Sequence, residues 1–514
     1  MRIKISQEDP SFRAVVITFK VTMILQSLIN IIKKSPRTAI FTSMLGIYYC
    51  VFWIAGTIPV NGGAGWDGAV FLKIIKAVSS GHWPNIDAYR ETRIGGFLPI
   101  TIGAMFFNLD DASIVKGQII INALQLAISV TILFEILIKL GLDKKTATIS
   151  VGSFVFSWPV LVMPIYYPIL SDHTALFIVC ISTWFWINSK NIALVAVSSF
   201  STLVIPGLFL IPLTMASLHF EQKKHNLSSH TVSKIQKIII PIMSILGVLL
   251  IFKIAYLESN VTEQQLLSSV GGPALASFKL KWVSLSISIT MLSLSLWKLI
   301  SISSMSEILN RIAFRPACLS ILATAITHIG LYIYVQNHIG FKGPPLLDNM
   351  LYQSLILPAA QLVSHFLYFG PVFLLGLVSI FRIKNTYKNI AIPFYFIFLL
   401  FLPALSLGSE SRQWLAVFPI IIVCFSLTTM STSLRLIVLM GSVFICFPIF
   451  GLDYQIHLAL HASKDLMSTS WQYYFGRQGP WMSQSSYLVG LSLAVLFLAV
   501  CSWCIKRNIS SARC

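Results

Sequence analysis

The strongest chemical signal in this sequence is a charged stretch that directly follows the first long apolar run. Within it, Asp67 follows Trp66 and lies between Gly65 and Gly68. Glycine lets the backbone turn tightly, which would hold the carboxylate at the edge of a membrane, where it can take a proton from a hydroxyl group. Alternatively, Asp67 is the N-cap of the next helix, and its side chain accepts the first free backbone amides. The two interpretations can both hold.

A second carboxylate, Asp172, lies in the short segment between two later apolar runs. Our assignment of the membrane runs places it on the same side as Asp67. Two acidic side chains on one face are what general acid–base chemistry needs. The competing interpretation is again an N-cap, in which Ser171 or Asp172 begins the helix that follows from His173.

Arginine side chains accompany the first carboxylate. Arg90 and Arg93 are three residues apart, next to Tyr89, so they can share one face of a helical turn. A guanidinium group can bind two phosphate oxygens at once through two parallel hydrogen bonds. The spacing of Arg90 and Arg93 therefore predicts a phosphate site. The alternative is a set of ordinary loop ion pairs with Glu91 or Asp87.

A later charged pair stands at the start of another apolar run on the same side. Glu410 and Arg412 precede Trp414 there, and Pro419 follows inside the run. Such charges are often only boundary residues of a membrane helix. Because these residues are expected on the same side of the membrane as Asp67, a second interpretation is that Arg412 binds an anionic lipid headgroup.

The composition predicts a polytopic membrane protein. Of the 514 residues, 56% are hydrophobic and only 11% are charged, whereas soluble domains contain about 25% charged residues. Runs of roughly 20 apolar residues can cross a bilayer. They lie at about 39–60, 113–138, 149–168, 173–189, 238–257, 282–302, 316–337, 363–381, 389–407, 413–430, 434–452 and 487–505, with a shorter pair, 191–205 and 206–220, broken at Pro206-Gly207.

The net charge of +19 reflects 37 Lys and Arg against 18 Asp and Glu. The basic clusters fall on one side of the membrane if the broken pair counts as two crossings, as the positive-inside rule requires. We therefore expect a cytoplasmic amphipathic segment at 1–38, a transmembrane domain at 39–505 and a cytoplasmic tail at 506–514. Large outer loops then lie at 61–112, with interfacial helices, and at 453–486, which is rich in aromatic residues.

Several classes of function are disfavoured. The basic charge is explained by cytoplasmic loops, so nucleic acid is not an expected partner. Most of the eight cysteines lie inside apolar runs, and Cys501 and Cys504 form a lone CxxC near the end of the last apolar run, which argues against a metal centre or a disulfide framework. The sequence also lacks a phosphate-binding P-loop, a dinucleotide fingerprint, a serine elbow and a zinc-protease motif.

The charged motifs together resemble bacterial GT-C-type integral membrane glycosyltransferases. The resemblance covers the first 220 residues in some detail and the rest by hydropathy. Its residues are Gly65-Trp66-Asp67-Gly68, Phe71-Leu72-Lys73-Ile74, Tyr89-Arg90-Glu91-Thr92-Arg93-Ile94, Leu98-Pro99, Ser171-Asp172-His173, and Glu410-Ser411-Arg412-Gln413-Trp414 with Pro419. The chain departs from the pattern at Asp172-His173, where the pattern often has Glu-Pro, and by lacking Arg or Lys near 202–207.

The resemblance implies an all-α, GT-C-like bundle of about 12 to 14 membrane helices in the bacterial inner membrane, with its active face outside the cytoplasm. It implies an inverting transfer of a sugar from a polyprenyl-phosphate donor to a saccharide, lipid or protein acceptor. Asp67 and Asp172 would be the catalytic residues, and Trp66, Tyr89, Arg90, Arg93, Glu410 and Arg412 would bind substrate and phosphate. No cofactor is implied, and the role of a divalent cation stays open. The alternatives are a transporter, or flippase, and a polymerase of lipid-linked saccharides.

Overall fold

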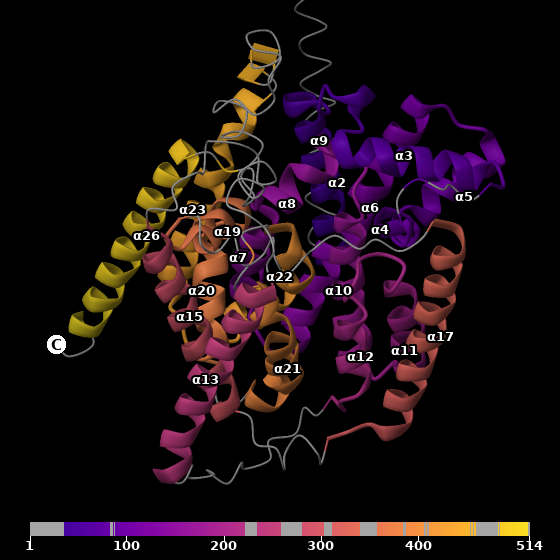
Figure 1. Ribbon diagram of the computed structural model, residues 1–514. Helices are drawn as coiled ribbons and strands as arrows, with labels where there is room; N and C mark the ends of the chain where they lie inside the picture. The colour runs from indigo at the N-terminus through magenta and orange to yellow at the C-terminus, as the bar shows by residue number, and fades with distance from the viewer. Residues whose placement is uncertain are drawn as a thin grey trace, which may run out of the picture.

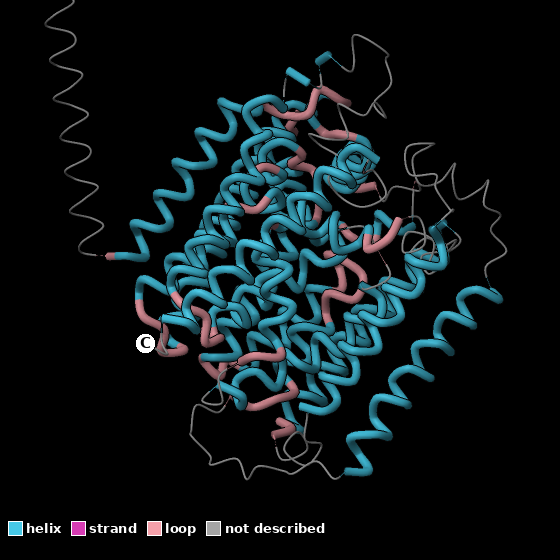
Figure 2. Tube along the Cα trace, turned by 90° about the vertical axis from the view of Figure 1, so that its left-hand side faces the viewer, coloured by secondary structure: helices cyan, strands magenta, loops and turns pink. Residues whose placement is uncertain are grey.

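The structure is a computed structural model. It describes residues 35–82, 86, 88–220, 234–258, 280–302, 311–339, 357–383, 387–405, 408, 411–452, 454–455, 457–458, 482 and 484–511. Within these ranges the chain is helical without strands (Figure 2). Glu410, Asp87, residues 1–34 and most of the outer loop at 453–486 lie outside the described residues.

The prediction of an all-α polytopic membrane protein is confirmed. In the described part of the chain, six stretches are helical, long and apolar enough to cross a membrane. They belong to α2 (Pro36–Ala55), α6 (Asp111–Lys139), α15 (Lys281–Ile302), α17 (Phe314–Ile339), α23 (Thr432–Cys446) with η7 (Phe447–Gly451), and α26 (Gln484–Ser511). A bent pair, α19 (Ala360–Phe369) and α20 (Pro371–Ile380), makes a seventh when counted as one span.

The described spans are fewer than the 12 to 14 expected from hydropathy because several apolar runs form shorter helices. The run at 149–168 is divided into α7 (Lys144–Val155), α8 (Trp158–Leu161) and α9 (Met163–Tyr166), and a proline occupies the second position of both α8 and α9. The run at 363–381 bends by 113° at Gly370, whose φ of +84° suits glycine. Other short or partly described elements are α10 (Asp172–Ile187), α13 (Lys234–Glu258), α21 (Lys388–Leu405), η6 (Ser411–Val417) and α22 (Phe418–Ser426).

The broken pair at 191–220 has the expected break. It forms α11 (Asn191–Ser201) and α12 (Leu210–Ala216), which pack against each other and against α17. Residues 202–209 between them are turns, and Gly207 has a φ of +80°. Helix α11 ends at Ser201, and Pro206 with the left-handed Gly207 lies in the turn that leads from it to α12.

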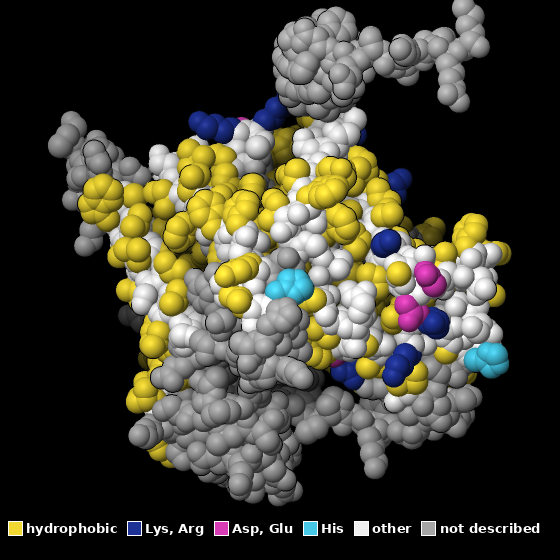
Figure 3. All heavy atoms as spheres, turned by 90° about the horizontal axis from the view of Figure 1, so that it is seen from above, with side chains coloured by type: hydrophobic (Ala, Val, Ile, Leu, Met, Phe, Trp, Pro, Cys, Tyr) yellow, Lys and Arg dark blue, Asp and Glu magenta, His cyan; other side chains and the backbone are white. Residues whose placement is uncertain are grey.

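The first outer loop folds into helices that lie across one end of the bundle (Figure 1). They are η1 (Asn61–Gly63), α3 (Trp66–Ser79), α4 (Ala88–Glu91), η2 (Ile94–Phe97) and α5 (Leu98–Phe107). In α3 the side chains of Phe71 and Ile74 are buried while Lys73 and Lys76 are exposed, so the expected amphipathic helix is present. Viewed from this end, much of the surface is hydrophobic, acidic and basic side chains lie together on the right, and further basic side chains lie at the top edge of the view (Figure 3).

A buried polar pair on α6 holds the segment that leads to α10. The Asn122 amide donates to the carbonyl oxygens of Pro164 (3.0 Å) and Pro168 (2.9 Å), and Asn122 accepts a hydrogen bond from Gln118 at 2.8 Å. Pro168 has no amide hydrogen to donate to the carbonyl of Pro164, four residues earlier. Asn122 supplies the missing donor and thereby fixes the backbone on either side of Tyr167.

Replacing Asn122 by leucine is expected to destabilise the protein. Two buried carbonyl groups would lose their donor, and each unsatisfied group costs about 1–3 kcal/mol. We therefore expect a clearly lower midpoint of thermal unfolding in detergent. The matched control is Thr131→Val on the same helix, because the Thr131 hydroxyl donates only to Ala127 of its own turn. An equal effect of the two substitutions would contradict the role given to Asn122.

The opposite end of the bundle carries a structural arginine. Arg435, near the start of α23, donates to the carbonyl oxygens of Phe425, Ser426 and Thr428 at 3.0–3.1 Å. These groups follow or end α22, whose last carbonyls have no helical amide to accept. At the same end Lys139 donates to Asn188 at the end of α10.

Candidate functional site

Three helix starts converge at the end of the bundle that carries the first outer loop. Asp67 is the second residue of α3, Asp172 is the first residue of α10, and Arg412 is the second residue of η6. Helix α10 packs on η6, which brings Asp172 to Arg412, and the backbone amide of Asp67 bonds to Tyr167 just before α10, which brings the start of α3 to them. The amino terminus of a helix stabilises negative charge, so both carboxylates sit where a helix favours them.

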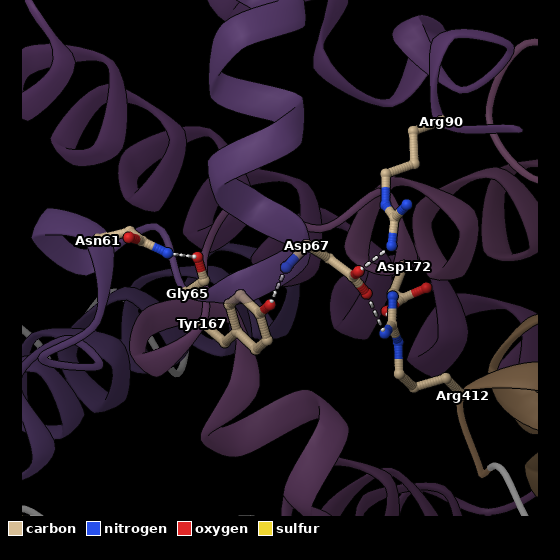
Figure 4. Close-up of polar contacts among 7 residues, drawn as sticks. All are labelled: Asn61, Gly65, Asp67, Arg90, Tyr167, Asp172 and Arg412. Carbon is tan, nitrogen blue, oxygen red and sulfur yellow. Dashed lines mark hydrogen bonds and ion pairs between the residues drawn. The ribbon is translucent and has the colours of Figure 1, made fainter. Parts of the chain in front are cut away.

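The two carboxylates are joined by a single guanidinium group (Figure 4). Arg412 donates through Nε to Oδ2 of Asp172 at 2.7 Å and through Nη1 to Oδ2 of Asp67 at 3.1 Å. The other oxygen of Asp67, Oδ1, accepts from Nη2 of Arg90 at 2.5 Å. Residues separated by up to 345 positions in the sequence therefore form one ion-pair network.

The solvent exposure of the side chains in the network increases from Asp172 in the interior to Asp67 and Arg90 at the surface. The side chain of Asp172 is 4% exposed and that of Arg412 is 12% exposed, whereas Arg90 and Asp67 are 29% and 31% exposed. A molecule arriving from outside can thus reach Asp67 and Arg90 more readily than Asp172. Asp67 is the better placed of the two carboxylates for contact with a substrate.

The N-cap interpretation of Asp67 is wrong, because the N-cap of α3 is Gly65 and no side chain caps it. The backbone amide of Asp67 instead donates to the Tyr167 hydroxyl oxygen at 2.8 Å. This contact leaves the carboxylate of Asp67 to the arginines. For α10, Ser171 occupies the N-cap position as one alternative expected, but no side chain forms a capping hydrogen bond there, and the carboxylate of Asp172 binds Arg412.

Close backbone approach explains the glycines of the motif. A Cβ on Gly65 would lie 2.1 Å from the ring of Tyr167, and Gly65 has a φ of +75° that side chains rarely adopt. A Cβ on Gly96 would lie 2.6 Å from Cβ of Ser171, next to Asp172. Glycine at both positions lets the outer loop rest directly on the segment before α10.

The remaining predicted residues of the outer loop lie beside the network. The guanidinium of Arg93 stacks on the ring of Tyr89 at 4.0 Å, its side chain is 8% exposed, and its Nε is buried with no hydrogen-bond partner among the described residues. Trp66 packs edge-on against Tyr167 with ring centroids 6.3 Å apart. Arg90 pairs with Asp67, and Asp87, one of its alternative partners, lies outside the described residues.

An apolar pocket adjoins the network through η6. Its cavity volume is about 40 Å³, and it is lined by α15, α19, α20, α21 and η6, with His365 and Trp414 among its walls. Nδ1 of His365 lies 2.9 Å from the hydroxyl of Ser411, the residue before Arg412. One short helix thus presents Arg412 to the carboxylates and Trp414 to the pocket.

Some residues of the site were not predicted from the sequence. Tyr167, Asn122, Gln118 and His365 hold the backbone or the side chains around the network. Gln118 and Asn122 are four residues apart inside an apolar run, and this spacing on one helix face was an available signal. Tyr167 gave no such signal, because its contact with α3 spans 100 residues.

Among the described residues, no group of three or more His, Cys, Asp or Glu side chains is arranged so that it could hold a metal ion. The carboxylates of Asp67 and Asp172 are hard oxygen ligands. In this structure both are occupied by arginines.

The network predicts how stability depends on pH. Burial by itself raises the pKa of Asp67, but the charges and hydrogen bonds of Arg412 and Arg90 outweigh it and lower the pKa from 3.8 to about 2. A lowered carboxyl pKa contributes stability that is present above the unfolded value and is lost as the pH falls through the folded value. We therefore expect the Asp67→Asn variant to unfold at a lower temperature than the wild type above about pH 4.

Thermal unfolding of both proteins in detergent between pH 2 and pH 7 checks this. The difference in midpoint should shrink as the pH falls from 4 towards 2, because Asp67 takes up a proton in the unfolded state over this range and begins to do so in the folded state near pH 2. A difference that is constant over this range would show that the charge of Asp67 does not stabilise the fold.

Comparison of the chain with protein-family models, with curated proteins and with solved structures gives no match.

Proposed function

We propose that this membrane protein is a glycosyltransferase of the GT-C type that uses a polyprenyl-phosphate-linked sugar as donor. The observation that carries the proposal is the meeting of Asp67 and Asp172 on Arg412, at the end of the bundle where the helices of residues 61–112 lie. A base beside a cation is what displacement of a phosphate from a sugar requires. The proposal places the site outside the cytoplasm, in the inner membrane of a bacterium.

The reaction would be a single displacement at the anomeric carbon. Asp67 takes the proton of the acceptor hydroxyl as its oxygen forms a bond to that carbon. The bond from carbon to the phosphate oxygen breaks, and the phosphate leaves with the electron pair and one more negative charge. Arg90 and Arg412 stabilise this charge. Attack from the side opposite the phosphate inverts the anomeric configuration.

The neighbouring apolar pocket supports a lipid carrier as the source of the phosphate. The pocket, at about 40 Å³, would have to widen to admit an isoprenoid chain, but Trp414 and its aliphatic side chains are suited to one, and η6 would then place the phosphate of that chain at Arg412. Ligand sites are mostly apolar pockets with a few convergent polar groups. The acceptor can be a saccharide, a lipid or a protein.

Transport of lipid-linked saccharides is the less favoured alternative. It requires polar groups along a path through the bilayer. Glu135, one of the few charged residues in the predicted spans, pairs with Arg37 near the end of α6. This pairing supports an anchoring role for Glu135 and gives no path for a substrate.

An assay with the purified protein in detergent tests the proposal. The protein is incubated with radiolabelled polyprenyl-phosphate sugars and a mixture of saccharide and lipid acceptors, and products are followed by chromatography. Transfer without any closed compartment, with an inverted anomeric linkage by NMR, is the expected result. No transfer from any polyprenyl-phosphate sugar, together with movement of the lipid across proteoliposomes, would favour the transporter instead.

A further inference from the structure

The proposed base is engaged on both of its oxygens. Oδ1 of Asp67 accepts from Arg90 and Oδ2 accepts from Arg412. A carboxylate that forms charge-assisted hydrogen bonds with two guanidinium groups is a weak base, because these bonds stabilise its ionised form. The resting network therefore holds Asp67 in a state that is poor at removing a proton from a hydroxyl group.

The two contacts of Arg412 are not equivalent. Asp172 binds Nε, the nitrogen next to the aliphatic part of the side chain, whereas Asp67 binds Nη1 at the tip. Asp172 is also the more buried partner, at 4% against 31% exposure. Asp172 can thus keep the guanidinium in place while the tip exchanges one anion for another.

We propose that the carboxylate of Asp67 occupies the place of the donor phosphate in the resting site, and that the arriving phosphate takes over Arg90 and the tip of Arg412 and thereby releases Asp67 as the base. This inference rests on the proposed function. Asp172 is then a positioning residue that fixes Arg412 through Nε. The site becomes reactive only after the donor has bound, so the donor binds before the acceptor.

The exchange conserves the number of ion pairs. A phosphate diester offers two non-bridging oxygens, which share one negative charge as the oxygens of a carboxylate do, to the same guanidinium groups. Contacts of the lipid and the sugar supply the additional binding energy that shifts the equilibrium. Asp67 and Arg90 are the two most exposed members of the network, so the exchange can occur from the outer face.

A measurable consequence is that Asp67 opposes phosphate binding. Removing its charge leaves Arg90 and Arg412 without the competing anion. The Asp67→Asn variant should therefore bind a prenyl phosphate more tightly than the wild type does, by roughly 5- to 30-fold, which corresponds to one ion pair of ordinary strength. A residue that only contacts the ligand would have the opposite effect when removed.

The experiment measures binding of farnesyl phosphate to the purified full-length protein by isothermal titration calorimetry in detergent. Farnesol serves as the uncharged probe and inorganic phosphate as the probe without a lipid chain. The matched control is Asp111→Asn, which removes the same charge from an exposed pair with Lys76 outside the site. If the asparagine variant at position 67 does not fold, Asp67→Ser removes the same charge with a residue suited to a helix start.

Tighter binding of farnesyl phosphate by Asp67→Asn, with no gain for farnesol and none for Asp111→Asn, supports the inference. Equal or weaker binding by Asp67→Asn overturns it. Sugar transfer is measured separately on the wild type, so the two ideas fail differently. If the wild type transfers sugar but Asp67→Asn gains no affinity for farnesyl phosphate, the proposed function stands and the exchange of anions is rejected. If Asp67→Asn gains affinity but the wild type transfers no sugar, the exchange stands and the proposed function is rejected. Absence of farnesyl phosphate binding in every protein overturns both.

Discussion

The Asp67→Asn variant is expected to lose sugar transfer, with a rate lower by roughly 10²- to 10⁴-fold, the usual contribution of a general base. Asparagine keeps the size of the side chain and an oxygen that can accept from Arg90, so the network loses charge but little shape. The rate is measured at saturating donor with the purified protein. Tighter donor binding in the same variant would lower the KM while kcat falls.

A control variant must show that loss of one negative charge elsewhere in the same region does not affect transfer. Asp111→Asn alters the same outer region without touching the network and should retain the wild-type rate. Each variant is compared only if it elutes as a monodisperse species and unfolds in a single transition. A wild-type rate in Asp67→Asn would exclude Asp67 as the base.

The class of the protein was predictable because membrane insertion depends on composition. An apolar run such as 39–60 must form its backbone hydrogen bonds internally, and helix α2 at Pro36–Ala55 is the result. The amphipathic spacing of Lys73 and Lys76 likewise predicted the exposed face of α3. Both inferences use only neighbours in the sequence.

Interruptions of the runs were harder to predict. Hydropathy does not register where an apolar run bends, so it indicates one span at 363–381 but not the bend at Gly370-Pro371. The run at 149–168 contains Pro159 and Pro164, which begin new short helices. Turn-forming residues inside apolar runs therefore carried more information than the average hydropathy did.

The site was predictable in its members but not in its contacts. Asp67, Asp172 and Arg412 were selected because charge next to apolar runs is costly and calls for a reason. Their pairing depends on how α3, α10 and η6 meet, and no local pattern specifies that. The role of Asn122 shows the same limit, since its partners are carbonyl groups that the sequence does not distinguish.

Arg412→Gln is expected to affect both activity and stability. It removes the cation between Asp67 and Asp172, and loss of one partner of a buried ion pair costs roughly 3 kcal/mol. Without Arg412 the leaving phosphate also loses a stabilising charge, and removal of one such group lowers the rate by about 10²- to 10³-fold. We expect a lower unfolding temperature together with loss of transfer.

Two further substitutions separate charge from geometry. Arg412→Lys keeps the charge, but a single ammonium group cannot reproduce the contacts of Nε with Asp172 and of Nη1 with Asp67. Stability should recover in part while transfer stays low. Arg37→Gln removes a cation at the other end of the bundle and should leave transfer unchanged. If the lysine variant transferred sugar at the wild-type rate, the bridging geometry of Arg412 would be irrelevant, and its charge alone would account for catalysis.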